Sequence, residues 1–240
     1  MNVASIYARL YLNCSRRALA SIAKSPWTLL LPVGLFLALQ LAGMLASPLG
    51  MLAGIVLGLV LAALGSCYLY FLGEVVANAR VQLSEFRKSI GAYFWSVANV
   101  LFVYWIASFV LGSLLSHSPE ARSADNALRL VALVLLNAVP EVIYQRHTYG
   151  GLATMQRAVQ FLQANWLEWG VPNLLLLLGL WLVLRDGLGL VVELGNLGLV
   201  LWSVVFGSLL HLVMVFRGHL FAALDGSSHR QRMFRYRTAA

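Results

Sequence analysis

Charged side chains are scarce in this chain of 240 residues: they make up 11% of it, and only 9 residues are acidic. Hydrophobic residues make up 60%, and the mean hydropathy is +0.80, which is far too apolar for an ordinary soluble domain. The patterns GxGxxG and GxxxxGK[ST] are missing, which excludes a Rossmann or P-loop domain. The composition therefore predicts a membrane protein.

Cysteine is also rare. Cys14 lies in a basic N-terminal segment and Cys67 inside an apolar run, and they are the only two, so we expect no disulfide framework. The HExxH, paired CxxC and EF-hand patterns are missing, so we expect no metal, no cofactor and no enzymatic activity. The net charge of +8 is compatible with nucleic-acid binding. Basic residues that flank apolar runs are explained by membrane orientation, however, so we expect no nucleic-acid partner.

Five runs without a charged residue approach or exceed the length of about 20 residues that crosses a bilayer. They extend from Trp27 to Ala46, from Pro48 to Gly73, from Ile90 to Ser116, from Trp169 to Leu184 and from Leu194 to Phe216. The first is longer than a typical signal-peptide core and is predicted to be an uncleaved span. A shorter run, Leu130 to Pro140, crosses only if Arg129 snorkels to one interface and Glu141 lies near the other.

The distribution of lysine and arginine favours six spans over five. With six, 14 of the 17 basic residues fall in the N-terminal segment, alternate loops and the C-terminal tail, and the other 3 fall on the opposite side. Arg217 is counted with the tail here. The positive-inside rule then places both termini in the cytoplasm, as expected for a multi-pass protein of a bacterial inner membrane.

Three segments of the sequence resemble one another. Each is a basic, amphipathic stretch that leads to a tryptophan at the start of a span, and these interfacial anchors are Trp27, Trp95 and Trp166. Glu74 and Glu141 follow the first two anchors by 47 and 46 residues (27 to 74 and 95 to 141). The alternative to a genuine internal repeat is that composition alone makes the segments similar, because many membrane hairpins have interfacial tryptophans and basic inner loops.

The predicted fold is an all-α integral membrane bundle of six transmembrane helices with amphipathic interfacial helices. A single membrane domain covers residues 1–240, with three parallel helix-hairpin repeats over 1–78, 79–147 and 148–225 and a basic tail over 226–240.

The first amphipathic stretch places apolar residues four apart and basic or polar residues on another side. The apolar set is Ile6, Leu10, Cys14, Ala18 and Ile22, and the other set is Arg9, Asn13, Arg16 and Lys24. This pattern predicts a helix that lies on the inner leaflet. The basic side would then face the anionic headgroups of the lipid bilayer, and a dedicated partner surface is the alternative.

Polar groups at membrane depth are the candidate functional residues. They are Glu74, Glu141, Asn137 and His211. A carboxylate there costs a few kcal/mol unless it is neutralised, paired or hydrated. Arg80, Arg146 and Arg157 are the expected cations for the two acids. The sequence leaves open a structural clamp between helices and a site for a substrate, proton or ion.

Glycines recur in the second span at Gly50, Gly54 and Gly58, and Gly65 follows one heptad later. Small residues at this spacing let another helix approach closely. We expect packing within the bundle, with homodimerisation as the alternative.

Three stretches carry a resemblance to a known family: SPWTLLLPVGLFLAL, LNAVPEVIYQ and GGLATMQRAVQFLQANWLEW. They resemble the bacterial multi-span proteins related to the membrane domain of glycerophosphoryl diester phosphodiesterases and the YciC-type uncharacterised proteins. Val159 stands where serine is usual there, and Ser25 replaces the common asparagine before Pro26. The resemblance implies a membrane fold and location, and it implies little about activity.

The sequence thus favours a non-enzymatic inner-membrane protein that acts as a scaffold or accessory subunit, with a membrane-protein partner. The alternative is a transport component, either a permease or a lipid-handling protein that uses its intramembrane carboxylates.

Overall fold

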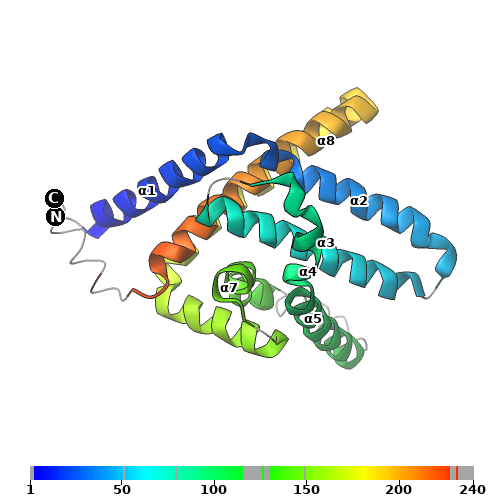
Figure 1. Cartoon of the computed structure of the whole chain (residues 1–240), viewed down its shortest axis with the longest axis horizontal. Helices are drawn as coiled ribbons and strands as arrows, with labels where there is room; N and C mark the ends of the chain where they lie inside the picture. Colours follow the sequence, from blue (N-terminus) through cyan, green and yellow to red (C-terminus); the bar gives the residue numbers. More distant parts are fainter. Residues whose placement is uncertain are drawn as a thin grey trace.

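The computed structural model of the chain is a bundle of α-helices (Figure 1). The structure describes residues 3–50, 52–78, 81–115, 126, 130–148, 150–227 and 231, and these contain no β-strand. The α-helices are α1 (Val3–Lys24), α2 (Leu31–Ala46), α3 (Leu52–Ala77), α4 (Phe86–Ala92), α5 (Phe94–Leu115), α7 (Val139–Arg146) and α8 (Gly151–Leu224). Short 3₁₀ helices cover Pro26–Leu30, Ser47–Leu49 and Leu83–Glu85. Breaks at Asn165 and Gly195 divide α8 into three helical segments.

Four stretches of the described chain are long and apolar enough to cross a membrane. They are Pro26–Leu49, Leu52–Ala77, Gly151–Gly187 and Leu197–Leu224. A fifth arises if α4 and α5, which are bent by 42° at Tyr93, cross together as Phe86–Ala92 and Phe94–Val110. The prediction of an all-α, multi-pass membrane architecture is confirmed in this form, with four to five candidate spans in the described residues.

The predicted run from Leu130 to Pro140 is not one of these candidates. Residues 130–135 are helical, but a turn over 136–138 separates them from α7. Pro140 lies in the first turn of α7, where the missing N–H of proline costs no helical hydrogen bond. Arg129, whose snorkelling the prediction required, lies outside the described residues.

Each of the three tryptophan anchors follows a break in the helical backbone. Ser25 (φ −143°, ψ 65°) precedes Trp27, Tyr93 (φ −123°, ψ 11°) precedes Trp95, and Asn165 (φ −132°, ψ 27°) directly precedes Trp166. Trp95 and Trp166 are mostly exposed, as interfacial anchors are. Trp27 instead packs edge-on against Phe71, with ring centroids 5.7 Å apart, so it also belongs to the core.

Two glycines turn the chain between neighbouring spans. Gly50 connects α2 to α3 with φ 55° and ψ −122°, and Gly195 lies between the last two segments of α8 with φ 56° and ψ −131°. Residues other than glycine rarely adopt this conformation. Beyond the second turn the chain folds back on itself, because a Cβ on Gly187 would lie 2.4 Å from the ring of Trp202.

Buried residues gather at one end of the bundle, which we call the core end. They come chiefly from the C-terminal halves of α3 and α8 and from α7, and include Phe71, Leu72, Val75, Val142, Val215, Leu220, Phe221 and Leu224. The opposite ends, which we call the hairpin tips, diverge in Figure 1. The tips expose apolar side chains such as Met44, Leu45, Leu52, Ile55 and Val200. The hydrophobic faces of the spans are therefore available to lipid or to another protein.

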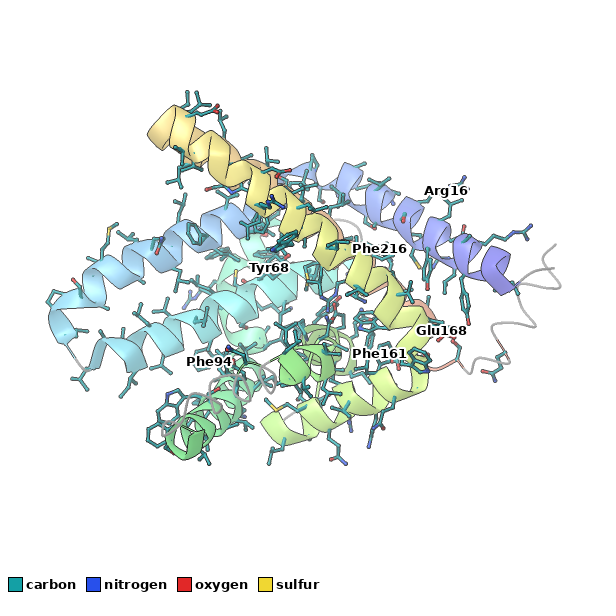
Figure 2. The ribbon with its side chains drawn as sticks, turned by 180° about the vertical axis from the view of Figure 1, so that it is seen from behind. Arg16, Tyr68, Phe94, Phe161, Glu168 and Phe216 are labelled. Atoms are coloured by element: carbon teal, nitrogen blue, oxygen red, sulfur yellow. The ribbon has the colours of Figure 1, made fainter. Side chains whose placement is uncertain are left out.

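Helix α1 lies alongside the last segment of α8 (Figure 1). Its predicted apolar stripe is buried: Ile6, Leu10, Cys14, Ala18 and Ile22 are at most 7% exposed. The hydroxyl of Tyr11 donates to the carbonyl oxygen of Glu168, and Ser21 Oγ lies 3.1 Å from His219 Nε2. Burial raises the pKa of Cys14 to about 11. This stripe therefore packs on protein, whereas Arg16 and the rest of the basic side face outward (Figure 2).

The predicted packing of the glycine stripe within the bundle is wrong at two positions. A Cβ on Gly54 or Gly58 would have no described atom within 4 Å, apart from its own helix. Gly65 does pack within the bundle, since its Cβ would lie 3.2 Å from Val97 Cγ1, and Gly50 serves the turn. The α2–α3 hairpin tip extends beyond the core end, and although α2 packs along α3 there, no described residue outside α3 covers its glycine face at Gly54 and Gly58.

Exchange of Gly151 for alanine should destabilise the protein, because the new Cβ would lie 2.5 Å from the backbone oxygen of Asn99. We expect a cost of about 1–3 kcal/mol. The matched control Gly54→Ala, whose Cβ meets open space, should be neutral or stabilising by up to about 1 kcal/mol. Thermal unfolding in detergent, followed by tryptophan fluorescence, measures both. Equal effects of the two exchanges would contradict this packing.

Candidate functional site

The buried carboxylate of Glu141 is the centre of the candidate site. Glu141 lies in the first turn of α7, and it is 0% exposed. Helix α7 begins at Val139, directly after the turn over 136–138, and Pro140 lies in its first turn, where the fixed φ of proline favours a helix. The start of α7 thus places an acid inside the core end of the bundle.

Arg217 of α8 neutralises this carboxylate. Its Nε lies 2.9 Å from Glu141 Oε1 and its Nη2 lies 3.0 Å from Oε2, so the pair is bidentate. Nη2 also donates to the backbone oxygen of Asn137 at 2.5 Å. Two parallel charge-assisted hydrogen bonds fix both distance and orientation. The Glu141 side chain is 0% exposed and the Arg217 side chain is 10% exposed, so the two charges are largely shielded from solvent.

An aromatic cluster covers the guanidinium. Arg217 Cζ lies 5.2 Å from the ring centroid of Trp169, which is within cation–π range. Trp169 in turn contacts Phe161 and Phe221, with centroids 5.3 and 6.1 Å away. The cluster excludes water from one side of the ion pair, which strengthens the attraction between its charges.

Two more polar contacts join α7 to the end of α8. Gln145 Nε2 donates to the backbone oxygen of Gly218 at 2.9 Å. Arg146 forms an ion pair with Asp225, with Nε 2.8 Å from Oδ2. Together with Glu141 and Arg217 they form a row of three contacts that runs from the buried core to the exposed rim.

The other predicted site residues lie apart from this pair. Glu74 lies in the last turn of α3 and accepts a hydrogen bond from Asn78 at 2.7 Å. His211 is 0% exposed, and its Nδ1 lies 3.4 Å from the hydroxyl of Tyr68, which points into the middle of the bundle (Figure 2). The structure therefore brings Glu141 and Asn137 together, while Glu74 and His211 have partners of their own.

Three buried polar atoms have no hydrogen-bond partner among the described residues: Asn137 Oδ1, Trp169 Nε1 and His211 Nε2. Most buried polar groups in proteins form hydrogen bonds, so these three atoms are exceptions that the packing of the core alone does not explain. No cluster of metal ligands occurs in the described part of the chain.

Two of the predicted cations for Glu141 are wrong, since Arg146 pairs with Asp225 and Arg157 donates to Thr148 Oγ1 at 3.4 Å. The third, Arg80, lies outside the described residues. Sequence reasoning missed Arg217 because it counted this residue with the basic tail. One signal was present: Arg146 and Arg217 each follow their tryptophan anchor by 51 residues (95 to 146 and 166 to 217).

Exchange of Glu141 for glutamine should destabilise the protein strongly, because it leaves the guanidinium of Arg217 buried without a counter-charge. Loss of one partner of a buried ion pair costs about 3–5 kcal/mol. Glu74→Gln is the matched control, since Glu74 has only a neutral partner in the described residues, and it should cost less than about 1 kcal/mol. Thermal unfolding in detergent distinguishes the two, and equal losses of stability would show that the pair is not central to folding.

The chain matches no protein-family model, no curated protein sequence and no solved structure. The resemblance to the glycerophosphoryl diester phosphodiesterase membrane domain and YciC-type proteins thus stays a prediction.

Proposed function

We propose that the protein is a non-enzymatic, multi-pass protein of a bacterial inner membrane that serves as a scaffold or accessory subunit of a membrane assembly. The closed ion pair between Glu141 and Arg217 carries this proposal. Both oxygens of the carboxylate bind the guanidinium, which also binds the backbone of residue 137. A carboxylate engaged in this way holds helices together and has little freedom to bind a substrate or to exchange a proton.

We further propose six spans in three parallel repeats, with both termini in the cytoplasm. The three backbone breaks before the tryptophan anchors and the similar glycine turns at Gly50 and Gly195 support a repeated unit. Arg217 is buried, so it no longer counts as a residue of the tail. The number of lysines and arginines on the cytoplasmic side then falls from 14 to 13, against 3 on the other side, and the positive-inside rule still favours the same orientation. The fourth span would be formed by the helical residues 130–135 together with α7.

The exposed face of α3 at Gly54 and Gly58 is the proposed contact for a membrane-protein partner. Helices in lipid associate through close packing at small residues, and no described part of the bundle covers this face. The exposed apolar residues at the hairpin tips enlarge the area that a partner could cover.

A second candidate function is transport, as a permease or lipid-handling component. The three unpartnered buried polar atoms at Asn137, Trp169 and His211 favour it, since polar groups inside a membrane bundle often mark a pathway. Under this hypothesis reconstituted vesicles would show a flux that depends on these residues. The closed ion pair argues for the scaffold.

Native mass spectrometry of the protein, gently extracted from its own membrane, tests the scaffold proposal. We expect a companion subunit in stoichiometric amount, and we expect Gly54→Leu to reduce that complex at least fivefold by blocking close helix approach. Because Gly54 has open space around it, this variant should keep the thermal stability of the natural chain.

Leu59→Trp is the matched control. Leu59 is 51% exposed on another side of α3, and the exchange adds bulk there without filling the glycine face. The control should retain the companion. Isolation of a lone chain with no companion, or equal loss in both variants, would contradict the scaffold proposal.

A further inference from the structure

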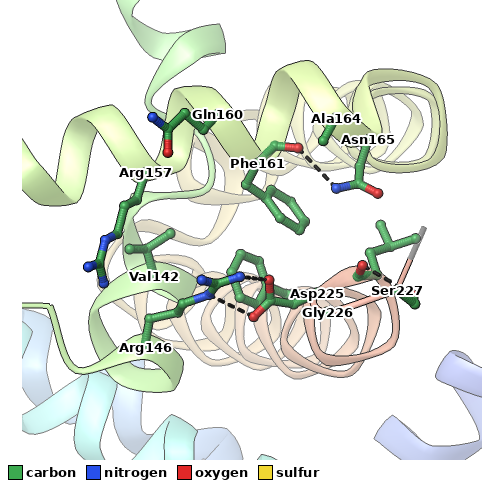
Figure 3. Close-up of a pocket in the computed structure, with 12 residues that line it drawn as sticks. Val142, Arg146, Arg157, Gln160, Phe161, Ala164, Asn165, Asp225, Gly226 and Ser227 are labelled. Atoms are coloured by element: carbon green, nitrogen blue, oxygen red, sulfur yellow. Dashed lines mark hydrogen bonds and ion pairs between the residues drawn. The ribbon is translucent and has the colours of Figure 1, made fainter. Parts of the chain in front are cut away.

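A cavity of about 500 Å³ opens at the core end, between the first segment of α8, the end of α7 and the residues that follow α8 (Figure 3). This volume lies within the range of about 300–1,000 Å³ that is typical of ligand sites. One wall is apolar and comes from Val142, Phe161, Phe221 and Leu224, all at most 8% exposed. The rim is polar and includes Arg146, Arg157 and Gln160. The cavity thus combines a hydrophobic wall with a cationic rim.

Arg157 is the cation that is available to a ligand. Its guanidinium donates to Thr148 Oγ1 at the long distance of 3.4 Å, and no carboxylate of the described residues pairs with it. Arg146, across the cavity, is held by Asp225, whose carboxylate also lines the space. The two arginines and Asp225 together give one net positive charge, which favours an anionic ligand.

The position of the cavity along the bundle indicates where this ligand comes from. The candidate span Leu197–Leu224 ends at the cavity, and Leu224, Asp225 and Ser227 line it. The end of a membrane-spanning helix lies at the level of the lipid headgroups. The sequence that follows adds Arg230, Arg232, Arg235 and Arg237, which further favour an anionic surface.

We propose that this cavity is a binding site for the phosphate group of an anionic membrane lipid. Arg157 would bind the phosphate. The wall formed by Phe161 and Phe221, whose ring centroids are 4.3 Å apart, would contact the glycerol and the first carbons of the acyl chains. Basic pockets between membrane helices bind anionic headgroups in this way. The proposal is independent of the scaffold function, since it concerns a different surface of the bundle.

Native mass spectrometry of the full chain in detergent tests the site by titration with three probes: dioctanoyl phosphatidylglycerol, dioctanoyl phosphatidylcholine and inorganic phosphate. We expect phosphatidylglycerol to bind most tightly. Arg157→Gln should weaken it about fivefold or more, the loss expected for one interfacial cation. Arg87→Gln is the matched control, because Arg87 is an exposed arginine on α4, away from the cavity, and it should change binding less than twofold.

A second variant keeps every charge. Ala164 lines the cavity and is exposed, so Ala164→Phe should fill the space and weaken binding as much as Arg157→Gln does. Equal affinity for the two lipids, equal effects of Arg157→Gln and Arg87→Gln, or the absence of binding would overturn the site. Displacement of phosphatidylglycerol by an equal concentration of inorganic phosphate would assign the site to free phosphate and overturn the proposal that it binds a lipid.

Discussion

The ion pair between Glu141 and Arg217 is the interaction on which the core end of the bundle depends. Burying two charges in an apolar bundle is costly, and their mutual bidentate bonds are the main contacts that offset this cost. The pair therefore fixes the position of α7, a helix of 8 residues that is too short to be stable alone. With α7 in place, Tyr144 fits closely against Gly73 and Gly218, and any larger residue at Gly218 would collide with its hydroxyl.

The bundle is packed unevenly along its length, and this asymmetry suggests how it works in a membrane. Its buried polar contacts and aromatic cluster lie at the core end, where α3, α7 and α8 meet. The hairpin tips expose leucine, isoleucine and methionine on the sides that no described helix covers. Lipid can solvate such surfaces without cost, and in lipid the association of helices depends on close packing. A rigid core end with open tips suits a protein that presents helices to others.

Local patterns in the sequence predicted the elements well, and long-range partners were harder to predict. The four-residue spacing from Ile6 to Ile22 correctly identified the buried side of α1, because helical periodicity depends only on neighbouring residues. The same pattern could not show whether lipid or protein covers that side, and α8 covers it. Likewise the acids at 74 and 141 share a sequence register, yet one ends a long helix and the other begins a short one. Counting Arg217 as part of the tail hid the partner of Glu141, since charge counts treat every arginine as solvated.

A double-mutant cycle at residues 141 and 217 tests the account most directly. Glu141→Leu and Arg217→Leu would each leave one buried charge without its partner, whereas the combined variant removes both charges. The account predicts that the double variant unfolds at a higher temperature in detergent than either single variant, with a coupling free energy of about 2 kcal/mol or more. If the losses of the two single variants simply add in the double variant, the two side chains do not stabilise each other and the account is contradicted.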